Sequence, residues 1–470
     1  MRWVLAVLAA GLTALGGWGL VNADSGLRTE QSTVDGVPLR TVRATAQPAG
    51  LRPAVVVAHG FAGSARLMAG FGDSLARRGF VVVLLDFNGH GANTNRPAQL
   101  MSNLDTALSH LRSLPDVDPQ RISLIGHSMG AGAVTRYAAT HPEIAATVAI
   151  SLPSASELPA DRPARLLLLV GAAEFPGFLQ AAHSAAQASP DRRLVEVPGV
   201  EHISILYAAQ THDEILAWLG APEGPAPAPA NRALAGVALL AAFGLAFSPL
   251  AQLVLRPASE PAAAPAPHKL GLLWAAMICV LAAAIAAAIP MGWMPIAVTN
   301  YVVAFTALAG LALLLVARGD RAAPRVVAPR SKVRLAVAFL VLAGYALSAI
   351  AIPLHLGITH AVPVWPRWWL LALTVAGFAT FSYGLIRLCG GRFWRTAAGF
   401  GIAVVVLTGA AVTGLAPGFL LLVVPLFAVL MAWQAGWTAT LTRLAAPAWL
   451  TAVVGAILPA LPAAVTLPLI

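Results

Sequence analysis

The stretch RISLIGHSMGAGAVTRY, residues 121–137, decides the fold. Its apolar, β-branched beginning at 122–125 predicts a short buried strand, and residues 131–139 predict a helix. Between them residues 126–130 read GHSMG, which is G-x-S-x-G in the context that this motif requires. A serine on such a sharp turn stands clear of the sheet, at a helix N-terminus that favours a developing negative charge. The pattern therefore predicts that Ser128 is a nucleophile.

Composition divides the chain of 470 residues into a polar part and an apolar part. Hydrophobic residues make up 58% and charged residues 11%, as in an integral membrane protein. Asp320 is the only acidic residue after Glu260, so the formal charge of +10 reflects Arg and Lys between apolar segments and does not indicate a nucleic-acid partner. The two cysteines, Cys279 and Cys389, lie in the apolar part, so the polar part needs no disulfide.

Four segments follow from this division. Residues 1–23 contain an apolar run long enough to span a bilayer, and they predict an N-terminal transmembrane anchor, with a cleaved signal peptide as the alternative. Residues 25–220 predict a soluble domain, and residues 221–231 a Pro/Ala-rich linker. Residues 232–470 predict a membrane domain of about eight transmembrane helices, which resembles no recognised family.

Within residues 25–220, apolar strands alternate with helical segments, the last of them at 203–219. This alternation predicts an α/β fold with a doubly wound, mostly parallel sheet and helices on both faces, followed by the all-α membrane bundle. Sites in such sheets lie at the carboxyl ends of the strands. Two further reactive side chains fall there, because Glu174 follows an apolar strand at 165–170 and His202 follows one at 193–197.

The order Ser128, Glu174, His202 resembles that of the α/β hydrolases, and most of all their dienelactone-hydrolase-type and esterase members. The resemblance covers about residues 28–220. It rests on four motifs, which are HGF at 59–61, DFNGHG at 86–91, GHSMG at 126–130 and GVEH at 199–202. It implies an α/β-hydrolase fold and a serine esterase.

The resemblance implies a role for each of these side chains. Ser128 would attack the substrate, His202 would take its proton, and Glu174 would orient the imidazole and stabilise its charged form. Aspartate is commoner than glutamate at this position of the family, so Asp191 and Glu201 remain alternative acids.

The resemblance also implies an oxyanion hole made by the backbone N–H groups of Phe61 and Met129. The residues around this hole and the nucleophile are expected to have supporting structural roles. They are His59, Gly60, Gly126, His127 and Gly130.

Charges between the apolar segments predict the orientation in the membrane. If Arg2 is cytoplasmic, the loops rich in Arg and Lys all fall on the cytoplasmic side, in agreement with the positive-inside rule. The hydrolase domain of this multi-pass protein would then lie on the extracytoplasmic side of the cell (plasma or inner) membrane. The loop cations are Arg256, Lys269, Arg318, Arg321, Arg325, Arg330, Lys332, Arg334, Arg387, Arg392, Arg395 and Arg443.

These features predict a membrane-anchored serine hydrolase that cleaves carboxylic esters through an acyl-enzyme on Ser128. A small-molecule or lipid ester is the expected substrate, and no motif indicates a metal, another cofactor or a particular protein partner. Two alternatives stay open. One is an acyltransferase whose acceptor is bound by the membrane domain, and the other is a channel, flippase or scaffold with a hydrolase-fold sensor domain. The predicted spans contain no acidic residue, which argues against a proton-coupled carrier.

Overall fold

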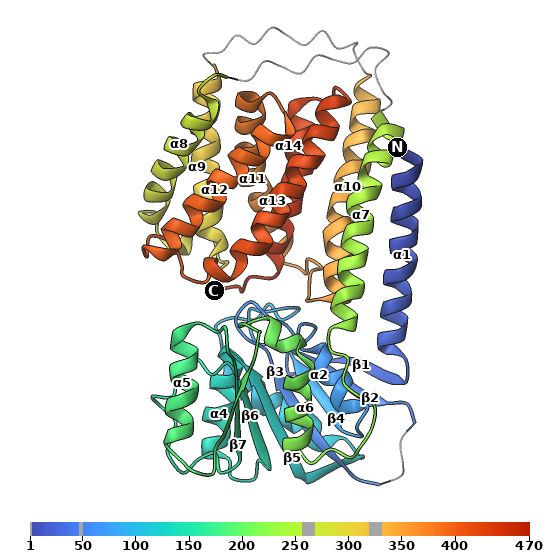
Figure 1. Cartoon of the computed structure of the whole chain (residues 1–470), viewed down its shortest axis with the longest axis vertical. Coiled ribbons are helices and arrows are strands. Elements are labelled where there is room, and N and C mark those ends of the chain that lie inside the picture. Colours follow the sequence, from blue (N-terminus) through green and yellow to red (C-terminus); the bar gives the residue numbers. More distant parts are fainter. Residues whose placement is uncertain (1, 47–49, 256–267, 319–330) are drawn as a thin grey trace. The chain divides into compact units, whose positions relative to one another are not determined.

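The computed structural model describes residues 2–46, 50–255, 268–318 and 331–470. The chain divides into two compact units, each described here by itself (Figure 1). The sheet unit consists of Leu15–Val237, Leu354–His360 and Pro468–Ile470. The helical unit consists of Met1–Ala14, Ala238–Pro353 and Ala361–Leu467.

The sheet unit contains eight strands, which are β1 (Leu27–Val34), β2 (Val37–Ala44), β3 (Arg52–Ala58), β4 (Val81–Leu85), β5 (Val117–His127), β6 (Ala146–Ile150), β7 (Leu166–Gly171) and β8 (Arg193–Val197). They form one sheet in the order β1-β2-β4-β3-β5-β6-β7-β8. β1 pairs with β2 and β2 with β4 in antiparallel fashion, and all other neighbours are parallel. The predicted fold class, a mostly parallel sheet with helices and a helical region after it, is confirmed.

Helices cover both faces of this sheet (Figure 1). Alternate residues of β3 therefore enter two different cores, with Val55 and Val57 packing in the core of Phe71, and Val56 in the core of Leu108. The helices are α2 (Ala69–Ala76), α3 (Leu100–Ser113), α4 (Met129–Thr140), α5 (Pro176–Gln187), the 3-10 helix η1 (Ser204–Tyr207) and α6 (Ala209–Trp218). The predicted helix at 203–219 is thus two helices, because Ala208 between them is extended.

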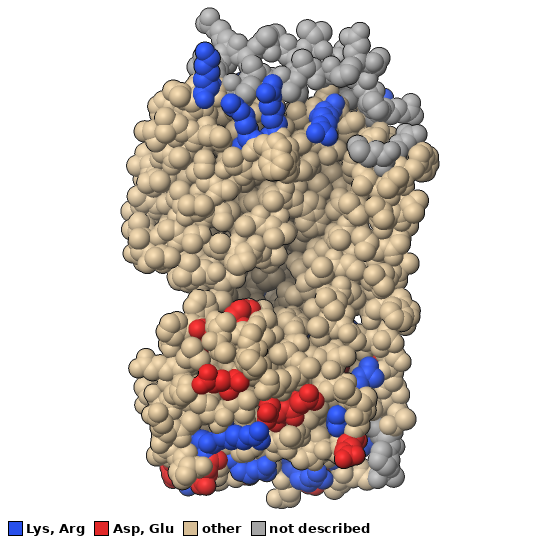
Figure 2. Space-filling model, viewed as in Figure 1, with Lys and Arg blue, Asp and Glu red and all other residues tan. Residues whose placement is uncertain are grey.

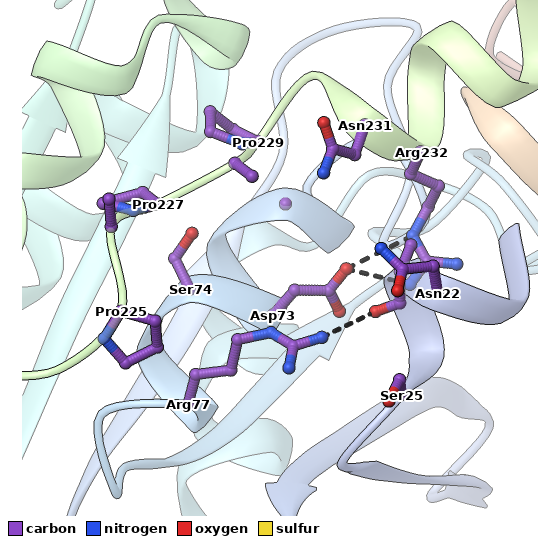
Figure 3. Close-up of a pocket in the computed structure, with 14 residues that line it drawn as sticks. Asn22, Ser25, Asp73, Ser74, Arg77, Pro225, Pro227, Pro229, Asn231 and Arg232 are labelled. Atoms are coloured by element: carbon purple, nitrogen blue, oxygen red, sulfur yellow. Dashed lines mark hydrogen bonds and ion pairs between the residues drawn. The ribbon is translucent and has the colours of Figure 1, made fainter. Parts of the chain in front are cut away.

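A cluster of charged side chains ties three segments of the sheet unit together, and Figure 3 shows two of its members, Asp73 and Arg232. Nη2 of Arg232 lies 2.8 Å from Asp73 on α2 and 2.8 Å from Asp24 at the end of α1 (Arg2–Asp24). Burial raises the pKa of Asp73, and the ion pair with Arg232 opposes this shift. Because Arg232 lies in the first turn of α7 (Asn231–Leu255), the cluster fixes the ends of both apolar helices to α2.

Eight helices of the described chain are long and apolar enough to cross a membrane, and α8 is a shorter apolar helix. The long ones are α1, α7, α9 (Thr299–Arg318), α10 (Lys332–Gly357), α11 (Arg367–Cys389), α12 (Phe393–Val412), α13 (Leu420–Arg443) and α14 (Ala448–Val465). α8 spans Gly271–Ala287, and a short 3-10 helix, η2, spans Met291–Trp293. Eight apolar helices, α7–α14, therefore follow the linker sequence.

Charge is unevenly distributed over the surface in Figure 2. In this view the acidic side chains belong to the sheet unit, and the Lys and Arg of the helical unit gather at one of its ends. Of the loop cations that predict the orientation, Arg256, Arg321, Arg325 and Arg330 lie outside the described residues.

One arginine of the helical unit is fully buried. Arg367, the first residue of α11, donates from Nη1 to the carbonyls of Ala464, 3.0 Å away, and Leu467, 2.8 Å away. These carbonyls lie at the C-terminal end of α14, where the helix dipole favours a cation.

Candidate active site

Ser128 forms the turn between a strand and a helix, because β5 ends at His127 and α4 begins at Met129. Its φ of 53° and ψ of −118° lie in a region that non-glycine residues rarely adopt. Its N–H donates to the Ile150 carbonyl at 2.8 Å, and its carbonyl accepts from Gly132 at 3.0 Å. The serine is half-buried, so the turn presents it where a substrate can reach it.

The two glycines of the motif are required by close backbone contacts. A Cβ on Gly130 would lie 2.5 Å from the carbonyl oxygen of Ala58 and 2.6 Å from that of His59. A Cβ on Gly126 would overlap the carbonyl of Gly130. The beginning of α4 therefore packs against the end of β3 at a distance that only glycine allows.

The structure brings the predicted acid and the predicted histidine together. Glu174 follows β7, His202 follows β8, and Nδ1 of His202 lies 3.0 Å from each carboxylate oxygen of Glu174. His202 is 2% exposed and Glu174 5%, so water hardly competes for this hydrogen bond. The alternative acids lie elsewhere, since Glu201 accepts from the backbone of Ile203 and Ser204, and Asp191 is exposed.

Ser151 also forms a hydrogen bond with Glu174, and this residue was not predicted from the sequence. It follows β6, is fully buried with a φ of 50°, and donates from Oγ to Oε2 of Glu174 at 2.7 Å. Oε1 accepts from the backbone N–H of Phe175 at 3.0 Å. Burial alone would raise the pKa of Glu174, but the hydrogen bonds from His202 and Ser151 outweigh it and hold the pKa below its usual value. A polar residue at the carboxyl end of a buried strand was the available signal.

Three aromatic rings contact the imidazole of His202, those of His127, Phe175 and Phe178. The ring of His127 lies 4.8 Å from it between centroids, and that of Phe178 lies 4.6 Å from it. Nε2 of His127 also donates to the carbonyl of His202 at 2.9 Å. Burial lowers the pKa of His127 to about 3, so this imidazole is neutral at physiological pH. His127 therefore holds the His202 loop in place by packing and by one hydrogen bond.

His59 holds the loop that follows β3. It is fully buried, its Nδ1 donates to the Gly60 carbonyl at 2.7 Å, and its Nε2 accepts from the N–H of Phe87 at 3.1 Å. Burial lowers its pKa well below the ordinary value, so the neutral form that makes both bonds is the stable one. Gly60 is placed so that an added Cβ would lie 2.9 Å from Nδ1 of His127, which brings this loop against the serine turn.

The predicted oxyanion donors belong to these two adjoining segments. Met129 is the first residue of α4, so its N–H cannot donate within the helix. Phe61 lies in the turn after β3, which Gly63 closes by donating to the Gly60 carbonyl at 2.9 Å. The Ser128 hydroxyl makes no hydrogen bond within the described part of the chain. Among the described residues, no group of three His, Cys, Asp or Glu side chains could hold a metal ion.

Comparison with known proteins agrees with the fold of the sheet unit. Residues 53–207 match the model of the α/β hydrolase fold family, so this part of the sheet unit is an α/β hydrolase domain. The resemblance seen in the sequence is therefore confirmed for this part of the chain.

Individual relatives match parts of the chain. An uncharacterised protein of Mycobacterium tuberculosis is 29% identical over 193 residues, which are 40% of this chain and 59% of that protein. Cutinase 2 of Thermobifida cellulosilytica is 31% identical over 101 residues, which are 21% of this chain and 38% of the cutinase. Among solved structures, an esterase of Pyrococcus furiosus aligns with a TM-score of 0.34 and 18% identity, over 42% of this chain and 94% of the esterase. The chain thus spans 59% of the length of the first of these relatives.

Proposed function

We propose that the protein is a membrane-anchored serine hydrolase that cleaves carboxylic esters, with Ser128, His202 and Glu174 as its catalytic triad. The buried hydrogen bond between His202 and Glu174, beside the strained Ser128 turn, is the observation that carries this proposal. The similarity to cutinases and the α/β hydrolase fold support an ester as the substrate class.

The mechanism follows from which nitrogen of His202 is engaged. Because Nδ1 faces Glu174, Nε2 is left to accept the proton of the Ser128 hydroxyl. Oγ of Ser128 then attacks the ester carbonyl, and Glu174 stabilises the imidazolium that forms. His202 returns its proton to the departing alcohol, which leaves an acyl-enzyme on Ser128. A water molecule, deprotonated by His202, cleaves the acyl-enzyme to the free acid and restores the serine.

The tetrahedral intermediates carry a negative charge on the former carbonyl oxygen. We assign its stabilisation to the N–H groups of Met129 and Phe61, because the first lies at a helix N-terminus and the second in the adjoining turn. Loss of one such donor typically costs about a hundredfold or more in rate. His59 and His127 take no proton in this mechanism, because burial keeps both neutral.

The proposal includes the side of the membrane. The eight candidate spans support a multi-pass protein, and the loop cations favour an extracytoplasmic hydrolase domain that meets lipid or other amphiphilic esters. The test is a Ser156→Cys variant, because Ser156 is exposed and both natural cysteines, Cys279 and Cys389, are buried. A membrane-impermeant maleimide should label this variant in intact cells, and labelling only after lysis would place the domain on the other side.

The enzymatic part is tested with detergent-purified full-length protein and p-nitrophenyl esters of increasing chain length. Wild type should turn over, and Ser128→Ala should fall to background. The matched control is Ser154→Ala, which removes an exposed hydroxyl and should retain full activity. Equal activity of wild type and Ser128→Ala would refute the proposed nucleophile.

A further inference from the structure

A pocket of about 370 Å³, distinct from the candidate active site, lies within the sheet unit. It is lined by β1, by the beginning of β2, by residues that follow β3 and β4, and by His355 and His360. None of the proposed triad or oxyanion residues lines it. The esterase mechanism therefore gives this pocket no role.

Two arginines in the lining, Arg40 and Arg66, form no ion pair with a carboxylate among the described residues. Arg40 is 9% exposed, and its Nε has no hydrogen-bond partner among the described residues. Arg66 donates from Nη1 to the carbonyl of His355 at 3.0 Å, and neither arginine forms an ion pair in the part of the chain that the structure describes. Burial lowers the pKa of Arg66 to about 10, but this value is still well above neutral pH, so the guanidinium keeps its charge. Two cations thus share a partly buried site whose lining contains a single acid, Asp86.

Asp86, the one acid in the lining, accepts backbone hydrogen bonds at both of its carboxylate oxygens. Oδ1 of Asp86 accepts from the N–H of Ala65 at 2.6 Å, and Oδ2 accepts from the N–H of Ala92 at 2.9 Å. These bonds fix the two segments that follow β3 and β4. Counting Arg40 and Arg66 against Asp86 leaves one net positive charge in the lining.

The remaining wall comes from the segment that ends α10. The N–H of His360 donates to Oγ of Ser64 at 3.1 Å, and Oγ1 of Thr359 lies 2.9 Å from the same oxygen. The rings of His355 and His360 are 5.0 Å apart between centroids. His355 lies in the last turn of α10, a helix long enough to cross a membrane, and lipid phosphates lie at the depth of such helix ends.

We propose that this pocket binds a phosphate group, carried by a lipid headgroup or free in solution. Guanidinium groups recognise phosphate oxygens through paired hydrogen bonds, and Arg is well suited to buried sites of this kind. Two guanidinium groups together offer more N–H donors than the two oxygens of a carboxylate can accept, whereas a phosphate presents three or four oxygens. Binding at this pocket is independent of the esterase activity.

The test is isothermal titration calorimetry on the full-length protein in an uncharged detergent. The ligands are inorganic phosphate, water-soluble dihexanoyl phosphatidic acid, and succinate as a carboxylate control. Arg66→Gln removes one half-buried cation, and Thr33→Glu places a carboxylate at an exposed position of the lining. Arg28→Gln is the matched control, because Arg28 lies on the same strand as Thr33 and is exposed.

Both phosphate ligands should bind wild type, and Arg66→Gln and Thr33→Glu should each weaken binding at least about tenfold. Arg28→Gln should bind as wild type does. Tighter binding of the lipid than of free phosphate would identify a headgroup site, and equal binding would identify a site for the phosphate alone; both support the proposal. It is overturned if neither phosphate ligand binds up to about 10 mM. It is also overturned if Arg66→Gln and Thr33→Glu bind like wild type, or if succinate binds as tightly as phosphate.

Discussion

Replacing Ser151 by alanine removes the hydroxyl that donates to Oε2 of Glu174 at 2.7 Å. The site is fully buried, so no water replaces the lost donor. Glu174 keeps its contacts with His202 and with the backbone N–H of Phe175. The change therefore perturbs the electrostatics of the acid and leaves the proposed triad otherwise complete.

The magnitude follows from the charge on the acceptor. A hydrogen bond to a charged group contributes about 1.5–3 kcal/mol, and one pKa unit corresponds to about 1.4 kcal/mol. The pKa of Glu174, now held below its usual value, should rise by about one to two units in Ser151→Ala. The carboxylate of this variant is then protonated at a higher pH than in wild type. The loss of activity on acidification should therefore also begin at a higher pH. Glu174 and His202 titrate as a pair, so the shift belongs to the apparent pKa of the pair.

The assay is the pH profile of kcat/KM for a p-nitrophenyl ester with purified full-length protein. The acid limb of Ser151→Ala should move up by about one to two units, with a loss at pH 8 of less than about tenfold. Ser151→Gly separates two causes, because glycine also lacks the hydroxyl but adopts the φ of 50° without strain. Both variants should shift alike, and exposed Ser154→Ala should not shift.

Three results would refute this reasoning. An unchanged acid limb in Ser151→Ala would show that the hydroxyl does not tune Glu174. A shift in Ser151→Ala but not in Ser151→Gly would assign the effect to backbone strain. A shift in Ser154→Ala would show that the profile does not report on the buried acid.

Three further predictions follow from the same contacts. Glu174→Gln should lower kcat/KM at least about a hundredfold at pH 7, because a neutral amide cannot stabilise the imidazolium; a stopped assay of the purified variant measures it. Gly130→Ala should lower the free energy of unfolding by about 1–3 kcal/mol through its backbone clash, whereas Gly132→Ala on the same helix, with its Cβ 3.4 Å from the nearest side chain, should melt at or above the wild-type temperature. Asp73→Asn should lower the free energy of unfolding by about 1–3 kcal/mol, because the Asp73 side chain is only 15% exposed. Asp24→Asn should lower it by less than about 1 kcal/mol, because the Asp24 side chain is 58% exposed. Equal shifts of the melting temperature in the two variants would contradict this order.

The sequence predicted the parts of the fold that depend on local patterns. The GHSMG turn lies between a buried strand and a helix as predicted, because both neighbours have strong apolar patterns. The helix at 203–219 was predicted as one piece because its apolar spacing continues through Ala208, where the chain is extended. Glu201, which accepts from the backbone of Ile203 and Ser204, starts the first turn at a point that hydrophobic periodicity does not mark.

Site residues could be predicted only where a motif or a position directly after a predicted strand distinguishes them. Glu174 and His202 follow strands at the carboxyl edge of the sheet, and the structure places them in contact. Ser151 occupies the same edge after β6, but a lone serine has no spacing that distinguishes it from a turn residue. The pocket that contains Arg40 and Arg66 could not be predicted from the sequence, because Arg66 and His355 are nearly 300 positions apart and meet through one hydrogen bond.

The most direct test of the account is whether Ser128 is an activated nucleophile. Detergent-purified full-length protein is treated with a fluorophosphonate probe, and the adduct is located by mass spectrometry. The account predicts one adduct, on Ser128, formed far more slowly in His202→Ala although that variant keeps the serine. Failure of wild type to label, or equal labelling rates in wild type and His202→Ala, would contradict the proposed triad.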